Sequence, residues 1–293
     1  MKSLRALAIT GIVGLTVLEG CSSVRRVTRV QTVGTSQTVS VEQVQKDIAE
    51  RDAAVQTLNA SVLIAASTGG SKEGQVKTYT SFRGYIFVRK PRELRVILQV
   101  PFVGSRALDM VSDGKTFTLL IPPRNRAIVG TNELTKVSKN GLENIRPAVF
   151  LDSLLLPAAA ANEFVAMTET MHVIEPAHGR KAEIDEPEYD LTVFRVAGGQ
   201  VLRARRVVHI SRVTLLPFQQ DIYDDQGEVV TQTTYANYVP AGGQQFPRLI
   251  TITRPLDEYS LRVEITKLTL NEQFPNDQFE LRVPPDVKVE RMD

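Results

Sequence analysis

Cysteine is almost missing from this sequence, which has 293 residues and one cysteine, at position 21. No disulfide is therefore possible within one chain, and a folded domain must be stabilised by its own apolar core. Tryptophan is absent and aromatic residues make up 6% of the chain, which argues against stacking platforms for bases or sugars. The formal net charge of +2 excludes the strongly basic field of a nucleic-acid-binding protein.

Groups for catalysis and metal binding are also scarce. The histidines, His172, His178 and His209, lack the paired spacing of a zinc site. No serine elbow, phosphate-binding glycine loop or calcium-loop spacing occurs. Two groups of acidic residues are interpreted as a solvated connection and a charged hairpin tip: Glu183, Asp185, Glu186 and Glu188, and Asp221, Asp224, Asp225 and Glu228. We expect no catalytic residue, no metal site and no cofactor, and hence no enzyme.

The N-terminus has the three parts of an export signal. Basic residues at positions 2 and 5 precede an apolar run over residues 6–18, which is too short to span a bilayer as a stable anchor. The following Leu18-Glu19-Gly20-Cys21 resembles the lipobox of bacterial lipoproteins, although Glu19 departs from that pattern. We expect a signal peptide over residues 1–20 and a lipid anchor on Cys21. The alternative is a cleaved secretory signal followed by an unmodified thiol.

Residues 21–39 are predicted to be the lipidated cysteine and a flexible tether. Residues 22–38 are small, polar and basic, although valines at positions 24, 27, 30 and 33 also permit a weak amphipathic stripe. Ser22 follows the cysteine, and in the enterobacterial sorting rule that this resembles, serine permits passage to the outer membrane. The expected location is the outer membrane, with the domain facing the periplasm.

Residues 40–293 are predicted to form one domain. Ser40 and the apolar spacing after it indicate a helix over residues 40–55. Alternating apolar residues then predict antiparallel strands, among them 76–90 and 277–283. The segment 143–171, rich in Leu and Ala, predicts two short helices, one on each side of Pro157. The expected fold is mainly β with a few helices (α+β) and about eleven strands.

Several motifs carry a resemblance to a known family. Gly84 lies in a strand, Val88-Arg89-Lys90-Pro91 ends it, and Ser112-Asp113-Gly114-Lys115 forms a hairpin turn. Near the C-terminus, Asp277-Gln278-Phe279-Glu280-Leu281 precedes two prolines. This stretch resembles the bacterial outer-membrane lipoprotein carriers and receptors, the LolA/LolB-like proteins, over about a third of the chain.

The resemblance implies an incomplete, strongly curved antiparallel β-barrel covered by a helical lid, with an apolar cavity that holds acyl chains. Lys90 stands where the carrier has an arginine that helps to hold the lid closed, and a lysine lacks the bidentate fork. The resemblance implies a lid-control role for Lys90, without the bidentate contact that the arginine makes.

The implied function is to bind acyl chains in lipoprotein localisation to the outer membrane. The implied partners are a lipid or acylated lipoprotein, the membrane and a periplasmic carrier protein, with no nucleic acid. The predicted ligand-binding residues are Leu94, Val96, Leu98, Phe102, Val103, Phe150, Leu151, Leu154 and Leu155.

Two choices stay open from the sequence. Phe102 and Val103 are either packed or exposed as a wedge for lipid or a partner. The segment 147–167 either lines a cavity or completes the core. A filled core would favour the alternative function, a structural or protein-interaction lipoprotein with no lipid ligand, and a hydrolytic enzyme is a more distant third.

Overall fold

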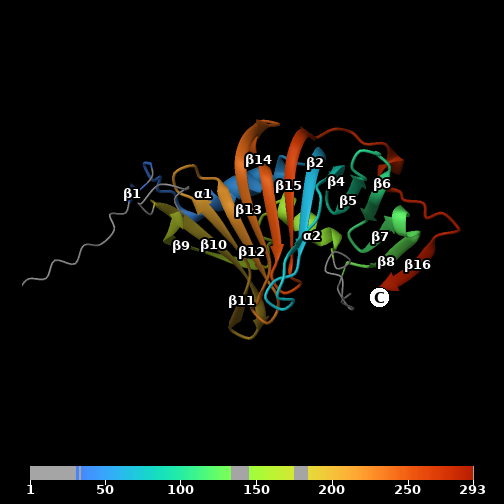
Figure 1. Ribbon diagram of the computed structural model, residues 1–293. Coiled ribbons are helices and arrows are strands. Elements are labelled where there is room, and N and C mark those ends of the chain that lie inside the picture. Colours follow the sequence, from blue (N-terminus) through green and yellow to red (C-terminus); the bar gives the residue numbers. More distant parts are fainter. Residues whose placement is uncertain (1–30, 33, 133–144, 175–183, 293) are drawn as a thin grey trace, which may run out of the picture.

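One sheet of sixteen strands dominates the computed structural model, which describes residues 31–32, 34–132, 145–174 and 184–292 (Figure 1). The helices are α1 (Val41–Ala53) and α2 (Pro147–Leu154), and the short 3-10 segments are η1 (Pro122–Arg124) and η3 (Asn276–Phe279). The strands are β1 (Gln31–Thr32), β2 (Thr57–Thr68), β3 (Lys77–Thr78), β4 (Phe82–Arg89), β5 (Glu93–Gln99), β6 (Arg106–Ser112), β7 (Thr116–Ile121), β8 (Arg126–Thr131), β9 (Glu163–Ile174), β10 (Ile184–Gly198), β11 (Val201–Ser211), β12 (Pro217–Tyr223), β13 (Val229–Ala241), β14 (Gln244–Arg254), β15 (Tyr259–Leu270) and β16 (Lys288–Met292).

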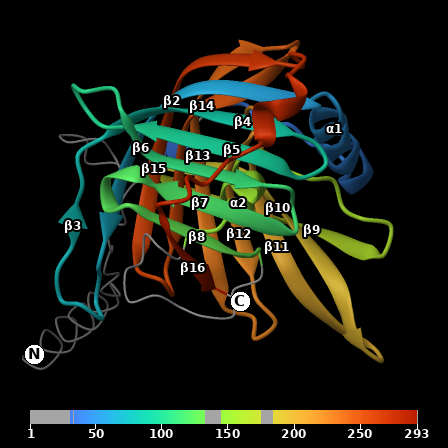
Figure 2. The same ribbon diagram turned by 90° about the vertical axis from the view of Figure 1, so that its right-hand side faces the viewer.

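The sheet is open and mostly antiparallel. Its order is β1-β10-β11-β12-β13-β14-β15-β2-β4-β5-β6-β7-β8-β16, with β9 paired to β10 and β3 paired to β2. The pairs β1–β10 and β16–β8 are parallel. Among the described strands the two ends of this order do not pair with each other, so the expected barrel is not confirmed. Figure 2 shows β4–β8 running across β11–β15 with α2 between them, so the sheet curls around this helix.

The main core lies inside this curl. Phe150 and Leu154 of α2 are buried against Leu94 of β5 and Ile250 of β14, in one apolar cluster. Strands on both sides of the curl thus bury their inward-facing residues on the same short helix, as the alternation of strand residues requires. Hydrogen bonds fix α2 in place, because Ser153 contacts the hydroxyl of Thr233 and the Gln220 side chain donates to the Asp152 carbonyl.

Helix α1 covers the other half of the sheet. The Ser40 side chain accepts a hydrogen bond from the Gln43 backbone N–H and so caps the helix, as predicted. Val44 and Ile48, one turn apart, are buried against Tyr189 and Leu191 of β10 and against β11 in a second apolar cluster. The predicted helix is confirmed to within two residues at each end.

Two glycines have clear structural roles in the part of the sheet that carries the family resemblance. A Cβ atom on Gly84 would lie 2.2 Å from the Ile97 carbonyl oxygen, so only glycine permits this approach of β4 to β5. Gly114 has a positive φ of 91° in the β6–β7 turn, where Asp113 accepts hydrogen bonds from two following backbone N–H groups. The predicted turn over Ser112–Lys115 is confirmed.

Four predictions about elements are wrong. Residues after Pro157 form the strand β9 rather than a helix, because they pair along β10. Residues 277–283 contain η3 and no strand, and the C-terminal strand is β16. The predicted strand 76–90 is two strands, β3 and β4. The predicted number of about eleven strands is too low, because β1, β9 and β16 were not anticipated and residues 76–90 form two strands.

The predicted signal peptide, Cys21 and most of the tether lie outside the described residues, so the domain boundaries stay predictions. Within the described residues, no helix has the length and apolar character needed to cross a bilayer.

Candidate functional site

Most of the predicted ligand-binding residues lie in the main core. Leu94, Val96, Phe150 and Leu154 are buried there, and three others pack against them: Leu98, Leu151 and Leu155. The predicted alternation of Leu94 and Val96 on one face of β5 is confirmed. These seven residues come together around α2, but packed side chains rather than open space separate them.

The cavity at the edge of α2 is small. It has a volume of about 50 Å³ and is lined in part by Leu154, Leu155, Tyr235 and Phe246. Ligand pockets usually measure about 300–1,000 Å³, so this space is too small for an acyl chain while α2 stays in place. The ligand-binding role of the seven core residues stays a prediction.

The other two predicted residues lie on the loop between β5 and β6, and neither lines this cavity. The relative exposure of Phe102 is 107% and that of Val103 is 74%, so both side chains stand in solvent. Phe102 has a positive φ of 65°, which a bulky residue rarely adopts, and a hydrogen bond from the Gly104 N–H to the Val100 carbonyl closes the turn. The arrangement is an exposed apolar tip.

A larger groove lies between α1 and the sheet. Its volume is about 300 Å³. Ile48 and Ala49 of α1 form one wall, and apolar residues of β9–β11 form the floor. The floor residues are Val165, Leu191, Val193 and Val208, and the remaining wall is Pro157, Ala158 and Ala159, with Glu42, Gln45, Lys46 and Arg206 also contributing. The groove is therefore mostly aliphatic with charged groups from α1 and β11.

Arg206 holds in place the wall of the groove that Pro157, Ala158 and Ala159 form. Its Nη2 donates a hydrogen bond of 2.6 Å to the Pro157 carbonyl. Burial lowers the pKa of this guanidinium, and the charges of Glu163 and Asp152 act in the opposite direction. The position of the segment from Pro157 to Ala159 thus depends on a half-buried cation.

Lys90 joins the end of α1 to the sheet. Its ammonium group donates to the Asp52 carboxylate, with an N–O distance of 2.5 Å, and also to the Asp52 backbone carbonyl. The other carboxylate oxygen of Asp52 accepts from the Ala158 N–H at 3.4 Å. One ion pair therefore links α1, the end of β4 and the wall of the groove. The lid-control role of Lys90 stays a prediction.

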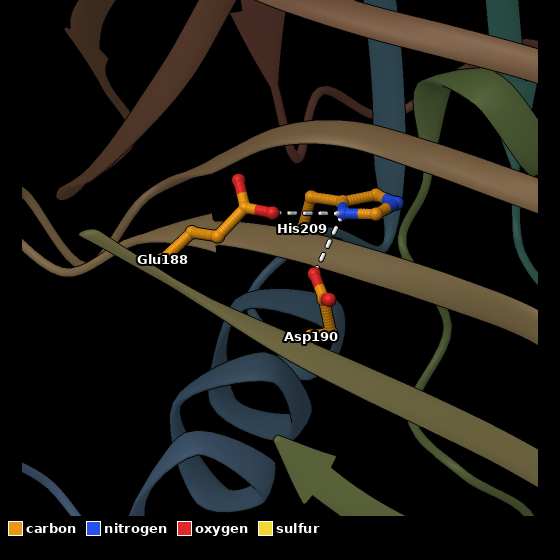
Figure 3. Close-up of side chains that lie close together, drawn as sticks. All are labelled: Glu188, Asp190 and His209. Carbon is orange, nitrogen blue, oxygen red and sulfur yellow. Dashed lines mark ion pairs between the residues drawn. The ribbon is translucent and has the colours of Figure 1, made fainter. Parts of the chain in front are cut away.

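A cluster of one histidine and three carboxylates lies on the opposite face of the same strands. His209 of β11 faces Asp190 across the β10–β11 ladder, with 2.7 Å between Nδ1 and Asp190 Oδ1. Glu188 Oε1 lies 3.6 Å from the same nitrogen (Figure 3). On the other side of the ring, Nε2 lies 3.3 Å from Asp221 Oδ2 of β12. Since Tyr189 and Leu191 face α1, their neighbours Glu188 and Asp190 face away from it.

The surroundings shift the pKa values within this cluster. Burial alone would lower the pKa of His209, but the hydrogen bond to Asp221 and the charges of Asp190 and Glu188 raise it. Burial raises the pKa of Glu188, with Asp190 adding to the shift and the Thr170 hydroxyl opposing it. Burial would raise the pKa of Asp221, but hydrogen bonds from His209, Gln232 and Gln219 lower it.

Comparison with solved structures identifies the fold. A LolA superfamily protein from Nitrosomonas europaea superposes with a TM-score of 0.52 at 12% identity, covering 83% of this chain and 99% of that one. The chain has the LolA fold. The resemblance predicted from the sequence is thereby confirmed for the fold. No protein-family model matches the sequence, and no curated protein matches it.

Two further structures have lower TM-scores, and the assignment does not depend on them. A DUF1329 family protein from Desulfovibrio piger has a TM-score of 0.48 at 15% identity, covering 83% of this chain and 98% of that one. An outer-membrane lipoprotein-sorting protein domain from Vibrio parahaemolyticus, named as putative, has a TM-score of 0.44 at 12% identity, covering 81% and 94%.

Two groups of residues in this LolA fold were missed from the sequence. The groove combines α1 with β9–β11, and β9 was predicted to be helical. Glu186 and Glu188 were interpreted as a solvated connection, yet they lie in β10, where Glu188 is buried. Acidic residues at 186, 188 and 190 alternate with apolar residues at 189, 191 and 193, and this period of two was the available signal.

Proposed function

We propose that this protein is a membrane-anchored periplasmic lipoprotein that binds an acyl chain of a lipid or acylated lipoprotein in the groove beneath α1. The groove carries the proposal, because its volume of about 300 Å³ lies at the lower end of ligand pockets and its floor is aliphatic. The LolA fold supports an assignment to lipoprotein localisation. The anchor would be the lipid on Cys21, which keeps the domain close to its membrane.

The size of the groove favours one chain rather than several. Each methylene group that leaves water contributes about 0.8 kcal/mol, so a chain of about ten contributes roughly 8 kcal/mol before the costs of association. No catalytic group is needed, because transfer between this groove, a periplasmic carrier and a bilayer follows relative affinity. A ligand in the core around Leu94, Val96 and Phe150 would require α2 to move away, which breaks the contacts of Ser153 and Gln220.

The exposed Phe102 and Val103 supply the contact with the bilayer in this proposal. Arg83 and Arg106 flank the loop and are exposed, which suits an anionic membrane surface. Burial of two apolar side chains contributes a few kcal/mol, enough for transient insertion and too little for a permanent anchor. The tip would thus bring the domain to the membrane surface at the moment of transfer.

The test is a titration of the full-length protein with fluorescently labelled palmitate, with native mass spectrometry for co-purified lipid. Ala49→Phe places an aromatic ring in the groove. The ring takes the space of two or more methylene groups of the acyl chain, so we expect about a tenfold loss of palmitate affinity. Ala53→Phe is the matched control, because Ala53 lies one turn further along α1, is exposed and does not line the groove. Its affinity is expected to stay within twofold of the wild-type value.

Two results would count against the proposal. Equal affinity of Ala49→Phe and wild type would remove the groove as the site. If wild type shows no palmitate binding and no co-purified lipid, the alternative gains: a structural or protein-interaction lipoprotein on the same scaffold. The small cavity beside α2 is the observation that favours this alternative.

A further inference from the structure

Three carboxylates surround one imidazole on the face of the sheet opposite the groove. The ligand atoms of Glu188, Asp190 and His209 all lie within 4.8 Å of one another. We propose that these three side chains bind a divalent transition-metal ion, with Zn²⁺ as the best-fitting ion, and that Asp221 is a positioning residue for the imidazole. This site is independent of the acyl-binding groove.

The donor atoms fit zinc in type and in place. Asp190 Oδ1 and Glu188 Oε1 both point at His209 Nδ1, at 2.7 and 3.6 Å (Figure 3). Tetrahedral zinc with bonds of about 2.0–2.2 Å to nitrogen and oxygen places its ligand atoms about 3.3–3.6 Å apart, within the range seen here. An imidazole ligand favours Zn²⁺ and related transition metals over Mg²⁺ or Ca²⁺, which prefer oxygen ligands alone.

The far side of the imidazole carries the partner that metal-binding histidines usually have. His209 Nε2 lies 3.3 Å from the Asp221 carboxylate, and the Gln219 amide in turn donates to Asp221 at 3.1 Å. A carboxylate on one ring nitrogen fixes the tautomer and directs the other nitrogen to the metal. Asp221 and Gln219 both lie on β12, so three neighbouring strands contribute to the arrangement.

Glu188 gives a second, independent indication of a ligand. Its side chain is 8% exposed. Thr170 donates to Oε1 at 2.9 Å, but the buried Oε2 has no hydrogen-bond partner. An unsatisfied buried oxygen costs about 1–3 kcal/mol, more when charged, and a cation removes that cost when both carboxylate oxygens of Glu188 bind it.

The charges agree with this assignment. Three ionised carboxylates against one imidazolium give a net charge of −2, and a divalent ion with a neutral imidazole changes it to −1. On binding, the proton on Nδ1 of the imidazolium leaves to solvent and a coordination bond from Nδ1 to the ion replaces the N–H bond. The ion would cross-link β10 and β11 at the position where His209 faces Asp190.

The test is isothermal titration of chelator-treated full-length protein with Zn²⁺ alone, with the visible absorption of bound Co²⁺ as a second readout. Glu188→Gln removes one ligand but keeps the contacts of His209 with Asp190 and Asp221, so this variant is expected to fold. Asp221→Asn is expected to lose about 10–100-fold in zinc affinity, and Glu188→Gln more than that. The control is His172→Gln, because His172 is an exposed histidine that packs on Phe218 beside the cluster but supplies none of its ligand atoms.

Wild-type affinity in His172→Gln together with large losses in the other two variants supports the site. Zinc binding that survives in Glu188→Gln, or that falls equally in His172→Gln, overturns it in favour of adsorption to exposed histidines. The absence of zinc binding by the wild type leaves the cluster as an ion network that only stabilises the sheet. Palmitate titration of the same variants keeps this outcome separate from the groove, because the two sites lie on opposite faces.

Discussion

Replacement of Asp109 by asparagine is expected to destabilise the fold by about 3–5 kcal/mol. Asp109 lies in β6 and is 0% exposed. The Arg95 guanidinium holds it with two hydrogen bonds, of 3.1 Å from Nε and 2.9 Å from Nη2, and Arg106 lies 3.0 Å from the same carboxylate. Arg95 also donates to the Gln278 carbonyl at 2.8 Å and so fixes the segment that contains η3.

The magnitude follows from what the substitution leaves behind. An asparagine fills the same space but carries no charge, so the Arg95 guanidinium, itself 13% exposed, loses its buried counterion. Removal of one partner of such a pair typically costs about 3–5 kcal/mol, a large part of the total stability of about 5–15 kcal/mol. Arg106 is 51% exposed, so Arg106→Gln is expected to cost about 1 kcal/mol or less.

Urea unfolding measures both variants. With a slope of about 1–3 kcal/mol per molar urea, Asp109→Asn is expected to lower the midpoint by about 1 M or more. Limited proteolysis should also cut the segment around Gln278 sooner, because Arg95 no longer holds it firmly. A loss below about 1 kcal/mol in Asp109→Asn, or an equal loss in Arg106→Gln, would refute the reasoning that burial makes this pair strong.

Three further outcomes are expected. Lys90→Ala should lower stability by about 1–3 kcal/mol, because the ion pair with Asp52 is mostly buried. The same substitution should speed the exchange of labelled palmitate measured by stopped flow, and an unchanged exchange rate would count against lid control. Phe102→Ser should slow palmitate transfer to anionic vesicles while the urea midpoint stays the same. The control Val76→Ser, at another exposed apolar residue, should transfer at the wild-type rate. Backbone hydrogen bonds from Thr116 and Lys115 lower the pKa of Asp113, so its stabilisation is present above pH 3.8 and is lost as the pH falls through the lowered value. Urea unfolding of Asp113→Asn between pH 2 and 6 should lack this acid-dependent loss, and an unchanged pH profile would disprove it.

Local signals were enough to predict much of this fold. The turn at Ser112–Lys115 closes through hydrogen bonds within four or five residues, and Ser40 caps α1 from three residues away. The alternation along β5 placed Leu94 and Val96 on the core side. In each case the residues that decide the structure lie beside one another in the sequence.

Pairing between distant segments decided the rest. The alanines before β9 favour a helix, yet Glu163–Ile174 pairs with β10 along its whole length, and tertiary pairing overrides local propensity. The parallel pairing of β16 with β8 joins Lys288 to Arg126 and has no local signal. The groove depends on the pairing of β9, β10 and β11, and the cluster of His209 with three carboxylates depends on the pairing of β10, β11 and β12. Sequence spacing alone therefore located the apolar core but neither of these sites.

The place of β2 in the sheet has a consequence for how the chain folds. This strand lies between β4 and β15, and its partners on the β15 side run from Thr68–Tyr259 to Leu58–Leu270, which are 191 to 212 residues apart in sequence. Contacts that close loops of that length form slowly. We therefore expect β2 to pair with β4 first and to keep its other edge, which faces β15 in the finished sheet, unpaired for some time. Such an edge is a template for wrong strand pairing. The long separation in sequence therefore predicts that the β2–β15 pairing at the centre of the sheet forms late, with β2 open to wrong pairing until then.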